Sequence, residues 1–313
     1  MRIRVVRCAA PAAAAVLLLA ACSKATTTAS TTPSAGGNFP QTIQATNGAV
    51  TIEAKPTRIV SLSPTLTEDL YAEGAGPQVV AVDQDSNYPA GVPKTSLSGV
   101  TPNVEAIAGY RPDLVVLSGD VEGLIASLGK LGIPVLNEPA ANTLADAYTE
   151  MTQLGAATGH TTAAAALVDA TRAKVSSLVA ALPSAGITET YYYELDQTFY
   201  TATSHTFIGS LFSLAGLKNI ADPHDDGTGY PQLNPETIIA ANPDFVFLAD
   251  SKCCAQTAAT IAARPGWATL SAVKDHRVIT LDDDIASRWG PRVTDLLAAI
   301  VQAVKGGGAS PTP

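Results

Sequence analysis

Short apolar runs alternate with amphipathic segments along most of the chain, in two blocks. In residues 58–137 the runs are RIVSL, QVVAVD, DLVVL and IPVLN, and in residues 190–281 they are TYYYEL, DFVFL and RVITL. Between them lie helix-like segments such as SPTLTEDLYAEGAG, with polar residues to begin a helix and glycine to end it. Strands that are apolar throughout are typical of parallel sheets covered on both faces. The pattern predicts an α/β protein with two lobes.

Residues 143–182 break this alternation, because they are nearly all helix formers with no strand between them. In the second part an apolar stripe recurs every three or four residues, at Leu167, Thr171, Val175, Leu178 and Leu182. A helix of about 22 residues is roughly 33 Å long. We expect this helix to brace the two lobes. The predicted boundaries are an N-terminal lobe at 50–157, a bridging helix at 158–183, a C-terminal lobe at 184–306 and a disordered tail at 307–313.

The first residues carry a targeting pattern. A basic start, MRIRVVR, precedes the apolar run CAAPAAAAVLLLA, which is too short to span a bilayer, and LAAC ends at Cys22. The pattern is similar to a bacterial lipoprotein signal, with residues 1–21 removed and lipid, including palmitate, on Cys22. The alternative is an ordinary secretion signal with a chance cysteine. Lipidation would anchor the protein to the cell membrane on its extracytoplasmic face.

Residues 22–49 are rich in Ser, Thr, Ala and Gly, so we expect a flexible leash. Acidic side chains number 28 against 19 basic ones, and three of the basic ones lie in the signal. This imbalance excludes a nucleic-acid partner. The remaining cysteine pair, Cys253 and Cys254, could form a vicinal disulfide in an oxidising compartment or remain as two reduced loop thiols.

The sequence contains an internal repeat of 14 residues, VEAIAGYRPDLVVL at 104–117 and PETIIAANPDFVFL at 235–248. In each copy a glutamate, Glu105 or Glu236, lies near a helix start, where the helix dipole favours it. Proline then ends the helix before a strand. Any helix-to-strand unit could need these residues. The alternative is that both glutamates face solvent, one on each lobe, and meet a partner with two basic patches.

Catalytic motifs are missing from the sequence. It has no nucleophile elbow, no glycine-rich phosphate loop and no HExxH pair, and its four histidines are scattered. The acidic runs HDD at 224–226 and DDD at 282–284 are interpreted as solvated loop charges rather than a metal site. We therefore expect a protein that is not an enzyme and has no cofactor.

Five stretches carry a family resemblance: RIVSLSPTLTEDLYAEGAG, SNYP, VEAIAGYRPDLVVL, GYPQLNPETIIAANPDFVFL and RWGPRVTDLLAAI. They resemble the substrate-binding lipoproteins of ABC importers, in the rigid-helix class that binds cobalamin, iron-siderophores and haem, and look closest to the cobalamin binders. The resemblance implies an α/β fold of two Rossmann-like lobes with central parallel sheets, one long rigid helix joining them, and a ligand cleft between the lobes. It also implies a monomer that docks on an ABC permease dimer with its ATPase subunits, through Glu105 and Glu236.

The implied ligand is a metal chelate, cobalamin or a ferric siderophore, held with little lobe closure. The alternatives are haem, or a structural or adhesion lipoprotein on the same scaffold. Aromatic side chains suit a large flat ligand, and an arginine can bind its polar groups in a bidentate way. The predicted ligand-binding residues are Tyr88, Ser118, Tyr193, Phe199, Tyr230, Asp284, Arg288 and Trp289.

Overall fold

The computed structural model describes residues 38–184 and 186–306. The predicted signal at 1–21, the lipidation site Cys22, most of the leash and the tail at 307–313 lie outside these residues. Within them, no helix is both long enough and apolar enough to cross a membrane.

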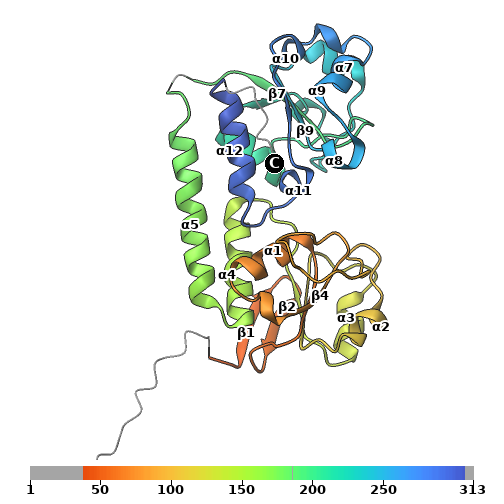
Figure 1. Ribbon diagram of the computed structural model, residues 1–313, viewed down its shortest axis with the longest axis vertical. Coiled ribbons are helices and arrows are strands. Elements are labelled where there is room, and N and C mark those ends of the chain that lie inside the picture. Colours follow the sequence, from red (N-terminus) through yellow and green to blue (C-terminus); the bar gives the residue numbers. More distant parts are fainter. Residues whose placement is uncertain (1–37, 185, 307–313) are drawn as a thin grey trace, which may run out of the picture. The chain divides into compact units, whose positions relative to one another are not determined.

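The N-terminal lobe is built on a parallel sheet of four strands, covered by helices (Figure 1). The strands are buried along almost their whole length, which is why their sequences are apolar throughout. They are β3 Ile59–Leu62, β4 Val79–Val82, β5 Leu114–Leu117 and β6 Val135–Asn137. The short helices are α1 Pro64–Ala72, η1 Gly76–Gln78, α2 Val104–Gly109 and α3 Leu124–Lys130.

The C-terminal lobe repeats this plan. Its strands are β7 Thr190–Glu194, β8 Lys218–Asn219, β9 Phe245–Leu248 and β10 Val278–Thr280. Its short helices are α6 Phe207–Leu214, η2 Asp222–His224, α7 Pro235–Ala241, α8 Ser251–Cys254, α9 Ala258–Ala262, η3 Trp267–Thr269, α10 Ser271–Lys274 and α11 Asp283–Ala286. The largest fully buried side chains of this lobe are aromatic, among them Phe212, Phe247 and Trp267.

Both sheets have the same strand order. The neighbours are β4-β3-β5-β6 in the first sheet and, read from its other end, β8-β7-β9-β10 in the second, and all the pairs are parallel. In each lobe the first strand therefore lies between the second and the third. The two copies of the repeated stretch, α2 with β5 and α7 with β9, occupy equivalent places in the two lobes. Each copy leads into the third strand of its sheet.

Three longer helices complete the structure: α4 Leu144–Thr158, α5 Thr161–Ala180 and α12 Val293–Val304. Gly159 ends α4 with a positive φ of 75°, a conformation that glycine adopts without steric cost. Helix α5 contacts both α4 and α12 (Figure 1). With 20 residues it is about 30 Å long. The predicted long helix is therefore present, in contact with helices that come before and after it in the chain.

A hairpin precedes the first lobe, where the sequence predicted a leash up to residue 49. Strands β1 Gln41–Ala45 and β2 Gly48–Ile52 pair in antiparallel fashion. Ile43 and Ile52 enter the core of the first lobe, and β1 lies against α4. The leash prediction is wrong for residues 41–49, because two buried isoleucines are enough to hold this polar segment against the lobe.

Candidate ligand-binding site

A cavity of 390 Å³ lies at the carboxyl ends of strands from both lobes. The N-terminal lobe contributes the residues that follow β3 and β4, and the C-terminal lobe contributes the residues that follow β10. Ligands of open parallel sheets bind at this edge, because the loops there diverge on either side of the first strand. The lining residues are Ser63, Pro64, Thr65, Gln84, Asp85, Asn87, Asp284, Ser287, Arg288 and Trp289.

Arg288 joins the two lobes in this cavity. Its Nη1 donates to Glu68 Oε1 at 2.7 Å and to Asn87 Oδ1 at 3.0 Å. Its Nη2 donates to the carbonyl oxygen of Asp85 at 3.1 Å and to Asp284 Oδ1 at 2.9 Å. The sequence predicted a guanidinium that offers its fork to the ligand. The structure places Arg288 on the cavity wall, but both of its terminal nitrogens are already hydrogen-bonded to protein.

Glu68 is the reason for this arrangement. It lies on α1, and its side chain is only 1% exposed. Arg292 also binds it, from Nε to Oε2 at 2.8 Å and from Nη2 to Oε1 at 2.5 Å. A buried carboxylate needs such partners, because an unpaired charge in the interior is costly. Glu68 was not among the predicted site residues, because the polar sequence of α1, PTLTEDLYA, gives no sign that this side chain is buried.

Tyr88 lies beside this network, with the guanidinium of Arg292 4.1 Å from the centre of its ring. The Tyr88 side chain remains 45% exposed. Arg292 thus holds the Tyr88 ring from one side, while much of the side chain stays open to solvent.

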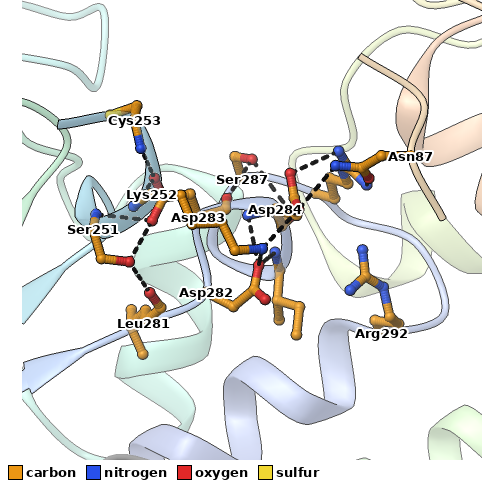
Figure 2. Close-up of polar contacts among 12 residues, drawn as sticks. Asn87, Ser251, Lys252, Cys253, Leu281, Asp282, Asp283, Asp284, Ser287 and Arg292 are labelled. Atoms are coloured by element: carbon orange, nitrogen blue, oxygen red, sulfur yellow. Dashed lines mark hydrogen bonds and ion pairs between the residues drawn. The ribbon is translucent and has the colours of Figure 1, made fainter. Parts of the chain in front are cut away.

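The acidic run of α11 is fully engaged, as Figure 2 shows. Lys252 Nζ binds Asp282 Oδ1 at 2.6 Å and Asp284 Oδ2 at 2.9 Å. The carboxylate of Asp283 accepts hydrogen bonds from the backbone N–H groups of Ser251, Lys252 and Cys253. For residues 282–284 the prediction of solvated loop charges is therefore wrong, because this run ties the segment after β10 to α8, which follows β9. In the other run, His224 and Asp226 are exposed, as predicted.

Asp284 is shared between this cluster and the cavity. Its Oδ2 also accepts from Asn87 Nδ2 at 3.1 Å (Figure 2). Burial disfavours its charged form, but the hydrogen bond from Lys252 and the charge of Arg288 outweigh that effect and lower the pKa of Asp284. Asp284 is therefore a fixed negative charge on the cavity wall.

Cys253 and Cys254 are joined by a disulfide at the end of α8. The carbonyl oxygen of Cys254 accepts hydrogen bonds from Gln197 at 3.3 Å and from Gln256 at 3.0 Å. The disulfide thus lies where the loops after β7 and β9 meet, at the carboxyl edge of the C-terminal sheet.

Tyr193 and Phe199 are both predicted to bind ligand, but Tyr193 belongs to the core and Phe199 is half-buried against it. Tyr193 is fully buried on β7 and donates its hydroxyl to the carbonyl oxygen of Ala286 at 2.7 Å. Phe199 packs 5.9 Å from Trp267, with Arg264 over its ring. Tyr193 cannot reach a ligand from this position, because both faces of a parallel sheet are covered and its side chain turns inward. Phe199 lies in the loop after β7, and its ligand-binding role stays a prediction.

The remaining predicted residues are distributed around the carboxyl edges of the sheets. Trp289 lines the cavity and donates its Nε1–H to Glu150 Oε2 at 2.9 Å. Ser118 follows β5 and is half-buried, but it does not line the cavity. Tyr230 is 46% exposed in the loop after β8 and also lies outside the lining, as does Tyr200, which is 42% exposed.

The two repeated glutamates are exposed at matching positions. Glu105 is the second residue of α2 and Glu236 the second residue of α7. Asn103 and Asn234 cap these helices, each accepting a hydrogen bond from a backbone N–H three residues later. In both copies the isoleucine two residues after the glutamate is fully buried. The helices are thus anchored through one face while the glutamates point to solvent.

Among residues 38–184 and 186–306, no group of three or more His, Cys, Asp or Glu side chains is arranged to hold a metal ion. The cavity lining contains hydrogen-bonding groups, two carboxylates, one guanidinium and one indole, but no general base paired with a nucleophile. Its chemistry is that of recognition.

Comparison with known proteins identifies the fold. The periplasmic binding protein family matches residues 59–285. This chain belongs to that family. A periplasmic binding protein does not transform its substrate, so the family confirms the prediction that the chain is not an enzyme. It also confirms the predicted resemblance.

Three relatives show how far the similarity extends. A Bacillus subtilis protein described as the uncharacterized ABC transporter substrate-binding lipoprotein YvrC is 32% identical, over 85% of this chain and 86% of its own length. The cobalamin-binding protein of Halobacterium salinarum is 30% identical, over 85% of this chain and 74% of its length. The periplasmic vitamin B12-binding protein BtuF of Vibrio cholerae has a known structure and is 25% identical to this chain, with a TM-score of 0.69. The match covers 81% of this chain and 98% of BtuF. The predicted two-lobed α/β fold is confirmed.

Proposed function

We propose that this chain is the substrate-binding lipoprotein of an ABC importer, and that it captures a metal chelate, cobalamin or a ferric siderophore, between its lobes. One observation carries the proposal. The 390 Å³ cavity is formed by loops at the carboxyl ends of strands from both lobes, where this kind of sheet presents its ligand site. The names of the Bacillus, Halobacterium and Vibrio relatives support an importer and a cobalamin-like ligand.

The ligand would rest on the cavity and extend beyond it. A volume of 390 Å³ is small for a corrin or a siderophore, since pockets for drug-sized ligands span roughly 300–1,000 Å³. Tyr88, Tyr200 and Tyr230 supply exposed aromatic surface near the carboxyl edges of the sheets. Their rings bury much area with few rotatable bonds. Arg288 and Asp284 would fix the shape of the cavity wall, while the hydroxyl and amide groups of the lining would form hydrogen bonds to the ligand.

The same ion network favours a cleft that changes little on binding. Glu68 of the first lobe binds Arg288 and Arg292 of the second lobe, and α5 contacts helices from both sides of the chain. Closure would require these buried pairs to break, which is costly.

Delivery would use Glu105 and Glu236. Two exposed carboxylates at equivalent corners of two similar lobes suit a permease dimer that presents one basic patch per subunit and works with its ATPase subunits. Each exposed ion pair is worth about 0–1 kcal/mol, so the pair would orient docking more than strengthen it. In this proposal the protein is a monomer anchored by lipid on Cys22 at the outer face of the cell membrane.

Haem is the second candidate ligand. It is favoured by the exposed tyrosines, because a phenolate oxygen can ligate haem iron. Absorption spectroscopy separates the candidates, since a tyrosine-ligated haem changes its Soret band on binding. A structural or adhesion lipoprotein remains the alternative from another class, and it predicts that no chelate binds.

The proposal is tested by titrating the purified protein with cobalamin, haem and a ferric siderophore while tyrosine and tryptophan fluorescence is recorded. We expect saturable quenching by one of the three, weakened in Tyr88→Ala and retained in Tyr193→Phe, whose position is in the core. Quenching by none of them would refute the chelate proposal. For docking, Glu105→Ala/Glu236→Ala should lose uptake but keep binding, whereas Glu53→Ala/Glu122→Ala, at exposed positions elsewhere, should keep both. Undiminished uptake in the first double variant would refute docking through these residues.

A further inference from the structure

A second cavity, of 350 Å³, lies within the N-terminal lobe. Its walls are the end of β1 and the turn after it, the segment that follows β6, and one face of α4. It shares no lining residue with the cleft cavity and includes none from the C-terminal lobe. Its lining residues are Gln44, Ala45, Thr46, Glu138, Pro139, Ala140, Ala141, Asn142, Asp146, Thr149, Glu150 and Gln153.

Glu138 is the unusual member of this lining. The residue is only 5% exposed, and its Oε1 is buried without a hydrogen-bond partner. No arginine, lysine or histidine lines the cavity. A buried carboxylate without a partner is destabilising, so this group either holds a proton or awaits a cation. Burial raises the pKa of Glu138 to about 7, so near neutral pH the choice between proton and cation is balanced.

The other carboxyl groups of the lining each have at least one hydrogen-bond partner, although Glu150 Oε1, like Glu138 Oε1, has none. Asp146 accepts from the backbone N–H groups of Asn142 and Thr143 in the capping box of α4. Glu150 accepts from Trp289 through Oε2, and its pKa is raised by burial and then by the neighbouring Asp69, so these two carboxyl groups behave as a pair that retains a proton. Glu138 is thus left as the charge that a ligand could neutralise.

We propose that this cavity binds a small organic cation, an alkylammonium or guanidinium group, with Glu138 as its counter-ion. Such a group donates several hydrogen bonds, and the lining offers matching acceptors in the side-chain oxygens of Gln44, Asn142 and Thr149. A metal ion fits less well, because no group of three or more ligating side chains is arranged for one in the described part of the chain. The volume limits the occupant to a small molecule.

The probe is butylammonium, added to the purified protein and followed by titration calorimetry at about pH 8, where most of Glu138 would be ionised. We expect saturable binding at one site and no binding of butan-1-ol, which has a similar size and no charge. Glu138→Gln should weaken butylammonium binding by at least about tenfold, because it removes a charge-assisted hydrogen bond. The matched control Glu53→Gln changes an exposed glutamate outside the lining and should leave the affinity unchanged.

A second variant guards against misfolding of Glu138→Gln. Thr149 lines the cavity but is exposed on α4, so Thr149→Tyr should fill the space without disturbing the core, and it should also abolish binding. Lowering the pH from about 8 to about 5.5 should weaken binding by about 30-fold, because protons compete with the ligand for Glu138, whose pKa is raised. The hydrogen bonds of Asp146 in the capping box and the proton shared by Asp69 and Glu150 should persist over this range.

Three results would overturn the inference: no saturable binding of butylammonium, equal binding of butan-1-ol, or unchanged affinity in both Glu138→Gln and Thr149→Tyr. The inference does not depend on the ligand of the cleft. A failed chelate titration leaves it standing, and a failed butylammonium titration leaves the proposed function standing.

Discussion

Replacing Glu68 by glutamine tests the most consequential contact between the lobes. Glu68 is buried and accepts three hydrogen bonds, one from Arg288 and two from Arg292. Glutamine keeps the shape, but it removes the charge and turns an NH₂ group toward two guanidinium groups. The side chains of Arg288 and Arg292 are only 9% and 17% exposed, so water cannot replace the lost partner.

Removing one partner of a buried ion pair costs about 3–5 kcal/mol. For a protein of this size each kcal/mol lowers Tm by about 2–4 °C, so we expect a decrease of roughly 6–20 °C. The assay is thermal and urea denaturation followed by circular dichroism. Glu53→Gln, at an exposed site, serves as the control and should change the free energy of unfolding by less than about 0.5 kcal/mol.

The result that would refute this reasoning is a loss below about 1 kcal/mol, the value typical of a solvated surface pair. It would mean that Glu68 and the two arginines do not form buried ion pairs in solution. If the pairs exist, Glu68→Gln/Arg292→Gln should lose less stability than the sum of the losses in the two single variants, because the effects of substitutions at residues in contact are not additive.

Three further predictions concern the helix caps, the buried acid and the core tyrosine. Asn103→Ala and Asn234→Ala should each lower the free energy of unfolding by about 1 kcal/mol in urea melts, and equal stability to wild type would contradict the cap assignment. Glu138 has a raised pKa of about 7, so between about pH 5 and 7 the folded state binds more protons than the unfolded state. The stability that this protonated carboxyl group contributes is present at acidic pH and lost as the pH rises from about 5 to 7. Glu138→Gln should remove this pH dependence from a series of melts. Tyr193→Phe should cost about 1 kcal/mol through the lost hydrogen bond to Ala286 while chelate affinity stays unchanged; a large loss of affinity would return Tyr193 to the ligand site.

Most of the fold could be predicted because its signals are local. Apolar runs of four or five residues became the buried strands, and the repeated stretch became two helix-to-strand units at equivalent places in two sheets. The hairpin was missed because its strands alternate small and polar residues and are held by only a few buried side chains such as Ile43.

The site was predicted less completely. Asp284, Arg288 and Trp289 do line the cleft cavity, and Tyr88 lies beside the network at its edge. The partner of Arg288, however, is Glu68, which lies 220 positions away in the sequence, and no local pattern marks such a pair.

The sequence alone determined the elements, the two lobes and the place of the repeated glutamates near helix starts, because periodicity and helix capping act over a few residues. Only the tertiary structure decided which polar groups neutralise one another. Arg288 is occupied by Glu68 and Tyr193 faces the core, whereas Glu138 is left unpaired in a second cavity. The reason is physical: the free energy of a buried charge depends on what packs against it, and those neighbours come from distant parts of the chain.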